Sequence, residues 1–264
     1  MSAPILLEIC ADSVESALAA ELGGAHRIEL CGSLLEGGVT PSSGLISAVR
    51  SKIGIDLYVM VRPRGGDFCY GPEEFETMER DVLTAKQLGA QGIVFGILRD
   101  DGSVDIRRTR HLVEIARPLK ATFHRAFDMS RDLEKSLEDL IMAGADRILT
   151  SGGEQKVEDG MSALARLVVN AKERIAVMAG GGITESNVHR ILEGTGVREI
   201  HASVKVHVPS PMRHRNEKVS MGIAKGREYQ RIMVRPEQVR RLLENAINGA
   251  PNRLSAERAS LRPL

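Results

Sequence analysis

The sequence has few cysteines, few aromatic residues and no excess of charge of one sign. Three cysteines, Cys10, Cys31 and Cys69, are too few and too odd in number for a disulfide framework, so we expect reduced thiols. Tryptophan is absent and aromatic residues make up 3% of the chain, which argues against surfaces that stack nucleic-acid bases. With 36 basic and 35 acidic residues, no overall field favours nucleic acid or an anionic membrane as a partner.

Targeting signals and long apolar runs are also missing. Residues 1–4 lead directly into a strand-like run, with no basic segment or cleavage-site pattern before it. No apolar run approaches the roughly 18 residues of a membrane-spanning helix. We therefore expect a cytoplasmic protein. The length of 264 residues with 42% apolar content favours one large domain over two small ones.

Short β-branched runs alternate with amphipathic segments along the chain, which is typical of βα units in a parallel sheet. The predicted strands are residues 6–11, 27–31, 57–62, 92–98, 120–125, 147–151, 176–180 and 199–204. The predicted helices are residues 13–22, 42–53, 72–88, 105–116, 132–143, 161–173, 185–192 and 236–247. Eight such units predict a TIM (β/α)8 barrel, with an open doubly wound sheet as the alternative. We assign residues 1–250 to one TIM-barrel domain and 251–264 to a frayed polar tail.

One predicted connection, residues 205–235, has no strand or helix period and is longer than ordinary loops. Loops of this length are usually functional or disordered. The segment follows the eighth predicted strand, on the side where barrel active sites are built. Whether it is a lid or an interface stays open, as does a homodimeric assembly.

A Glu-x-Cys pattern occurs twice, at Glu8 to Cys10 and at Glu29 to Cys31. Because alternate side chains of a strand point to one face, each acid shares a wall with its thiol. Both copies end consecutive predicted strands, so a parallel sheet would set them side by side, ~4.8 Å apart. Two alternatives stay open: the acids are structural and paired with Arg62 or Arg125, and the thiols are small buried apolar groups.

Further polar residues lie near the ends of other predicted strands, at positions whose side chains would point into the barrel. They are Arg62 on the third strand, His124 on the fifth, Ser151 on the sixth and His201 on the eighth, with Arg125 and Asp128 as further mouth residues. A packed barrel interior needs no such set of acids, thiols, imidazoles and guanidiniums. The set predicts a polar mouth, although each histidine could instead be a satisfied core residue.

Arginines and glycines after the strands favour an anionic ligand. Arg62 and Arg64 precede a Gly-Gly pair, and glycines follow the sixth and seventh predicted strands. Barrels often bind phosphate in the loops after strands seven and eight, so the glycines after the seventh strand are in the right position. The predicted anion-binding residues are Arg62, Arg64, Ser151, Gly180 and Gly181. In an enzyme acting on a small phosphorylated or carboxylated compound, the general acid and base would come from Glu8, Glu29 and His124. No motif indicates an organic cofactor.

Several ordered motifs resemble the CutC family of copper-homeostasis proteins. They include Leu7-Glu8-Ile9-Cys10, Arg27-Ile28-Glu29-Leu30-Cys31, Glu36-Gly37-Gly38-Val39-Thr40-Pro41, Arg62-Pro63-Arg64-Gly65-Gly66-Asp67-Phe68 and Phe123-His124-Arg125-Ala126-Phe127-Asp128. The likeness extends over about residues 6–221.

The resemblance implies a TIM barrel, a cytoplasmic location and a role in copper tolerance or trafficking, with Cys10 and Cys31 as Cu(I) ligands. Soft thiolates do select Cu(I). We therefore expect Cu(I) binding at the barrel mouth, with an enzyme of unknown substrate as the alternative. Copper does not explain the polar groups beside the thiols, above all Glu8 and Glu29, whereas an enzyme would use them.

Overall fold

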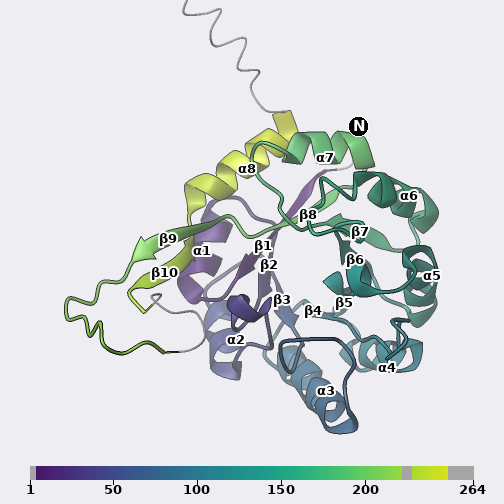
Figure 1. Cartoon of the computed structure of the whole chain (residues 1–264), viewed down its shortest axis with the longest axis horizontal. Helices are drawn as coiled ribbons and strands as arrows, with labels where there is room; N and C mark the ends of the chain where they lie inside the picture. The colour runs from purple at the N-terminus through teal and green to yellow at the C-terminus, as the bar shows by residue number, and fades with distance from the viewer. Residues whose placement is uncertain (1–3, 222–227, 249–264) are drawn as a thin grey trace, which may run out of the picture.

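The computed structural model describes residues 4–221 and 228–248 and contains a closed barrel of parallel strands (Figure 1). The strands are β1 (Leu6–Ala11), β2 (Arg27–Leu30), β3 (Asp56–Met60), β4 (Gly92–Phe95), β5 (Lys120–Phe123), β6 (Arg147–Thr150), β7 (Ala176–Ala179) and β8 (Glu199–Ala202). Strand β8 pairs in parallel with β1 and closes the ring. The predicted TIM barrel is confirmed, and closure rules out the open doubly wound sheet.

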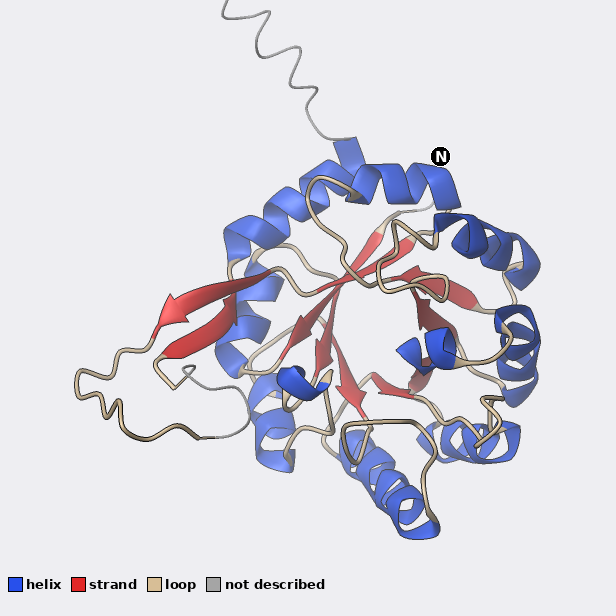
Figure 2. Cartoon of the chain, in the orientation of Figure 1, coloured by secondary structure: helices blue, strands red, loops and turns tan. Residues whose placement is uncertain are grey.

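Helices form a ring outside the strands (Figure 2). They are α1 (Val14–Leu22), α2 (Ser43–Arg50), α3 (Pro72–Gln87), α4 (Ile106–Ala116), α5 (Leu133–Ala143), α6 (Met161–Ala171), α7 (Val188–Thr195) and α8 (Pro236–Asn248), with 3-10 turns η1 (Leu34–Glu36) and η2 (Arg125–Met129). Ser13, Ser42 and Asp132 cap helix starts by accepting a backbone N–H three residues on. Within the described residues, no helix combines the length and the apolar character needed to cross a bilayer.

Most predicted strands extend too far at their C-terminal ends, by up to three residues. Strands β2, β3 and β5 end at Leu30, Met60 and Phe123, and the backbone N–H that follows each of them still donates to the neighbouring strand. The predicted functional residues that follow, such as Cys31 and His124, therefore lie just past the last residue of a strand. They sit on the rim of the barrel rather than in its wall.

Side chains alternate between two cores. Leu57 and Val59 of β3 point outward into the large apolar cluster beneath the helices. Tyr58 and Met60 point inward, where they join Cys10 and Cys31 in a small separate cluster. The parity predicted for this strand is therefore confirmed. Because little of the barrel interior is filled by branched apolar residues, it has room for polar groups.

Residues 205–235 differ from their prediction. Strands β9 (Lys205–Pro209) and β10 (Gln230–Val234) form an antiparallel hairpin that projects from the barrel beside α1 (Figure 1). The hairpin joins α1 through an ion pair between Arg231 and Glu15 (2.7 Å) and a hydrogen bond from the Val234 N–H to Ser16. We missed these strands because Met233 and Val234 are their only buried residues, which leaves no alternation of buried and exposed positions along either strand. Residues 222–227, and the tail predicted at 251–264, lie outside the described residues.

Candidate functional site

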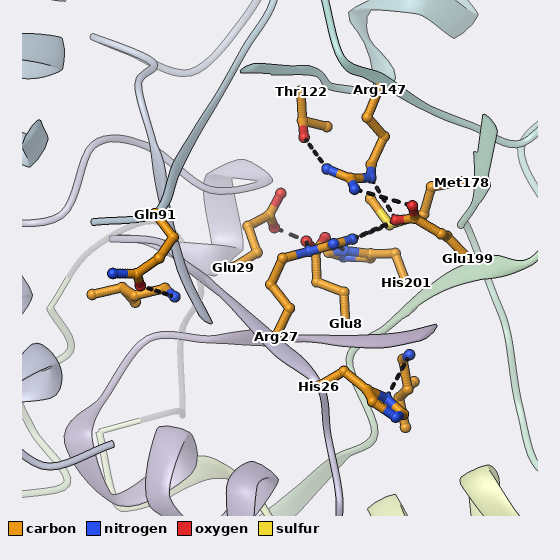
Figure 3. A network of polar contacts seen from close by, with 12 residues as sticks. Glu8, His26, Arg27, Glu29, Gln91, Thr122, Arg147, Met178, Glu199 and His201 are labelled. Carbon is orange, nitrogen blue, oxygen red and sulfur yellow. Dashed lines mark hydrogen bonds and ion pairs between the residues drawn. The ribbon is translucent and has the colours of Figure 1, made fainter. Parts of the chain in front are cut away.

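A network of paired charges lies inside the barrel near the N-terminal ends of the strands, which we call the lower part of the interior (Figure 3). Arg27 of β2 donates to Glu8 of β1 and, over 2.8 Å, to Glu199 of β8. Arg147 of β6 donates to the same Glu199 over 2.5 and 3.0 Å. The Tyr58 ring lies 4.7 Å from the Arg27 guanidinium carbon and 5.5 Å from that of Arg147. Each buried charge here has an opposite charge in contact, which is how buried ions are tolerated.

The two Glu-x-Cys copies are staggered, which corrects the expectation that they lie side by side. Glu8 pairs in register with Arg27, and Cys10 pairs with Glu29. Strands in a closed barrel tilt and shift against their neighbours, so equal positions in two consecutive motifs are not directly opposite each other. The suggested pairing of the glutamates with Arg62 or Arg125 is also wrong for Glu8, whose partner is Arg27.

The thiols and the second acid form a compact group above this network. The sulfurs of Cys10 and Cys31 lie 3.9 Å apart, and the Cys31 sulfur lies 3.5 Å from Glu29 Oε2. His201 connects the two levels, since its Nδ1 is 2.7 Å from Glu8 Oε1 and its Nε2 is 3.8 Å from Glu29 Oε2. Four groups predicted from the sequence thus meet, together with Glu8 below them.

The two glutamates have opposite protonation preferences. Burial alone would raise the pKa of Glu8, but the charge of Arg27 and the hydrogen bond from His201 outweigh it and lower that pKa to about 2. Burial, followed by the negative charges of Cys10 and Glu8, raises the pKa of Glu29 to about 8, although His201 acts against the shift. At neutral pH Glu8 is therefore a carboxylate, and Glu29 is largely protonated.

His201 and the thiols complete this charge pattern. Burial lowers the pKa of His201, but nearby acids and the hydrogen bonds to Cys10 and Glu8 raise it well above its usual value. The Glu8 carboxylate, hydrogen-bonded to Nδ1, is one of the groups that raise this pKa. The hydrogen bond between the thiols lowers the pKa of Cys10 well below its usual range, and the same contact together with burial raises that of Cys31. One thiolate beside one thiol is the stable arrangement.

A cavity of about 390 Å³ opens above this group. Cys10, Glu29 and His201 line its floor, whereas Glu8 and Cys31 are not among its lining residues. Its apolar lining residues are Leu34, Met60, Phe68, Leu149 and Ile183. Of the two sulfurs, only that of Cys10 therefore lines the cavity.

Arg62 and His124 line the same cavity. Arg62 donates to the carbonyl oxygens of Glu36 (2.6 Å), Gly38 (2.9 Å) and Gly66 (2.9 Å), so it holds two mouth loops together. His124 accepts the Ala126 N–H at its Nδ1 over 3.1 Å. Burial and then the charge of Arg62 lower the pKa of His124 to about 3, so its ring is neutral at physiological pH.

The remaining predicted residues have internal partners. Arg64 lies outside the cavity lining and pairs with Glu74 (2.5 Å) and Asp67 (3.1 Å). Asp128 pairs with Arg125 (2.7 Å) and accepts from the Ser151 hydroxyl (2.9 Å). Gly181 and Arg125 line the cavity, but Gly180 and Ser151 do not. The predicted anion set therefore divides into residues that reach the cavity and residues that support its walls.

Sequence reasoning missed Arg27, Arg147 and Glu199. Each lies an even number of positions from a residue that was predicted to point into the barrel, and so points the same way. Arg27 precedes Glu29 by two positions, and Glu199 precedes His201 by two. Applying the alternation over whole strands, instead of their ends alone, would have found them.

Two side-chain groups have the composition of a metal site among the described residues. Cys10, Glu29 and Cys31 form one, and Glu8, Glu29 and His201 form the other, with ligand atoms within 4.8 Å of one another. The second group shares Glu8 with Arg27, whose positive charge opposes a cation there. The thiol group has no arginine partner and suits a soft ion better.

Comparisons with known proteins agree on one family. The model of the CutC family matches residues 5–206. A copper homeostasis protein cutC homolog from Mus musculus is 50% identical over 217 residues, covering 82% of this chain and 80% of the relative. A family protein CutC from Chromobacterium violaceum is 45% identical over 239 residues, covering 90% and 97%. A crystal structure named for the copper homeostasis protein CutC of Streptococcus agalactiae has a TM-score of 0.72 at 35% identity, covering 75% and 97%.

Proposed function

The chain belongs to the CutC family, and on that premise we propose that it acts in copper homeostasis by binding Cu(I) through Cys10 and Cys31. The observation that carries this proposal is the 3.9 Å separation of two reduced sulfurs, of which the sulfur of Cys10 lines the floor of the cavity. The names of the relatives support the general role in copper homeostasis.

The geometry fits a soft ion. Metal–sulfur bonds of ~2.3 Å, the length found in zinc thiolates, allow one ion to contact two sulfurs at this separation. The low pKa of Cys10 supplies a thiolate without a large cost for removing its proton. Cys10 would receive the ion from the cavity, and Cys31 behind it would complete the pair. We extend the proposal to a reducing compartment, the cytoplasm, because oxidised thiols could not bind the ion.

Anaerobic Cu(I) titration against a strong chelator tests the proposal. Cys10→Ser and Cys31→Ser should each lower the Cu(I) affinity at least 100-fold, because one sulfur cannot hold the ion alone. Cys69→Ser is the matched control, since Cys69 is exposed and lies outside the cavity lining, and it should bind as the wild type does. Wild-type affinity in both buried-cysteine variants would exclude this copper site.

A second candidate function, an enzyme acting on a small anionic compound, is favoured by the polar groups that copper does not use. The predicted roles change in detail. Glu8 is fully buried and held by Arg27, so a substrate cannot reach it. His124 is neutral at physiological pH and can donate a proton in a hydrogen bond but is a poor base. Glu29, at the cavity floor with a pKa of about 8, is the remaining candidate for acid–base chemistry.

Mass spectrometry of the denatured protein, purified at low ionic strength, tests this candidate. A small carboxylate or phosphate recovered in stoichiometric amount would support it. Recovery of the same compound from a Glu29→Gln, Arg62→Met double variant would count against it.

A further inference from the structure

Arg62 is a buried cation that has no carboxylate partner. It is 6% exposed, and its terminal nitrogens donate only to backbone carbonyl oxygens. Within residues 4–221 and 228–248, no acid lies within ion-pairing distance of Arg62. The Tyr70 hydroxyl contacts this guanidinium but brings no charge, because burial raises its pKa. By contrast, Arg27 deeper in the barrel contacts two carboxylates. A buried charge without a counter-ion is costly, so a missing partner is indicated at Arg62.

His124 supplies a hydrogen-bond donor with no acceptor. Its Nδ1 accepts the Ala126 N–H, so Nδ1 carries no proton. The ring is neutral, and its one proton must therefore reside on Nε2. That Nε2 is buried and has no partner among the described residues. An unsatisfied buried donor in a native protein calls for an explanation, and a bound acceptor is one.

Both residues line the same cavity, and one aromatic ring lies against both. The Phe68 ring is 5.0 Å from the Arg62 guanidinium carbon and 5.0 Å from the His124 ring. The Arg62 Nε and His124 Nε2 atoms are covered in this conformation. Phe68 follows Gly65 and Gly66 in a loop where the backbone of Gly66 is left-handed (φ 82°), and it is only half-buried. For a ligand to reach either N–H group, the side chains that cover it must move.

We propose that the cavity binds a small organic carboxylate, whose oxygen accepts the His124 Nε2–H and whose charge balances Arg62. The apolar lining residues, among them Leu149 and Ile183, would contact the hydrocarbon part of the ligand. A carboxylate supplies what these two residues lack, one acceptor oxygen and one negative charge. Lys205 also lines the cavity, so inorganic phosphate is the competing anion that the test has to separate. The proposal deepens the second candidate function and does not depend on copper binding at Cys31.

Nitrogen-15 correlation spectra of the histidine rings, recorded on the full chain, test the proposal. Before ligand is added, one histidine ring, that of His124, should keep a protonated Nε2 and an unprotonated Nδ1 from pH 5 to 8. Titration with acetate, pyruvate and 4-methylpentanoate should shift that Nε2–H signal in a saturable way, most tightly for the probe with the longest apolar tail. Inorganic phosphate is the comparison arm and should bind more weakly.

Two substitutions at His124 separate ligand binding from folding. Asn places an acceptor where Nδ1 is and keeps the Ala126 contact, but it removes the donor toward the cavity. Gln can place an N–H near the Nε2 position and loses the Ala126 contact. His124→Asn should lower carboxylate affinity roughly 10- to 100-fold, as expected for a lost hydrogen bond to a charged group. His124→Gln should stay within a few-fold of the wild type, with lower thermal stability.

The two proposals can fail independently. Cys31→Ala should lose Cu(I) and keep carboxylate affinity, because Cys31 is not among the cavity lining residues. His124→Asn should keep Cu(I) and lose the carboxylate. No saturable shift with any of the three carboxylates, equal affinity in His124→Asn and the wild type, or tighter binding of phosphate would each overturn the carboxylate proposal.

Discussion

The lower barrel interior and the barrel mouth contain similar polar groups but differ in how completely these are paired. Below, Glu8, Arg27, Arg147 and Glu199 satisfy one another. Six buried side-chain atoms in the described residues have no hydrogen-bond partner, and three of them belong to cavity-lining residues: Glu29, Arg62 and His124. Burial and charge are alike in the two regions, so the degree of pairing is what separates a structural group from a binding group.

Breaking the lower network should have the largest effect on stability. Arg27→Met leaves Glu8 as a buried charge without its main partner, and we expect a loss of about 3–5 kcal/mol in the free energy of unfolding. Urea denaturation measures it. The control is Arg64→Met, which removes a partly exposed pair and should cost about 0–1 kcal/mol. Equal losses in the two variants would remove the distinction between the regions.

Lowering the pH should expose the cost of the buried neutral His124. Its folded pKa of about 3 lies below the unfolded value of 6.5, so the unfolded chain binds the proton first and stability falls as pH drops from 6.5 toward 3. At pH 4 the protonation of this group should have lowered the free energy of unfolding by about 3 kcal/mol. Denaturation from pH 7 to 4 should therefore show a shallower decline in His124→Asn than in the wild type. Glu8 contributes its own loss below pH 4.5 in both proteins, and parallel curves would show that His124 does not titrate as stated.

Removing Arg62 should cost less than removing Arg27, although both are buried. Arg62→Met gives up hydrogen bonds to three carbonyl oxygens but also removes a charge without a counter-ion, so we expect a loss of about 1–3 kcal/mol. The same denaturation series measures it. A saturating concentration of 4-methylpentanoate should raise the melting temperature of the wild type and not of the variant. A loss as large as that of Arg27→Met would mean that Arg62 is chiefly structural.

The projecting hairpin should show the smallest effect. Arg231→Ala removes an exposed ion pair with Glu15, and the free energy of unfolding should change by less than about 1 kcal/mol. Cu(I) and carboxylate affinities should be unchanged, because Lys205 is the one described residue of 205–235 that lines the cavity. A change in either affinity would revive the possibility that this segment acts as a lid.

The sequence was sufficient for the barrel and for the inward parity of its strands, since both follow from local periodicity. Tyr58 and Met60 could be placed inside the barrel from alternation alone. The register between strands could not be predicted, because it depends on the tilt and shift of the whole closed sheet. For that reason the partner of Glu8 was misassigned, although Arg27 carried the right parity.

The sequence predicted which residues form the candidate site, but it did not predict the protonation state or the role of each one. Glu8 and Glu29 look alike in sequence, yet one is a locked carboxylate and the other a largely protonated acid at the cavity floor. The difference arises from the neighbour that each glutamate contacts on the adjacent strand. The residues next to each glutamate in the sequence do not reveal which neighbour that is.

On the proposed copper function, the stagger of the two Glu-x-Cys copies would favour soft ions over hard ones. The sulfur of Cys10 lines the cavity beside Glu29, whereas Glu8 lies deeper and is paired with Arg27. An ion that prefers oxygen would need Glu8 as a further ligand and would meet the guanidinium that repels it. An ion that prefers sulfur would bind the two thiols and leave the deeper charges paired. The shift of the repeated motif by two residues would thereby set the ion selectivity of the site.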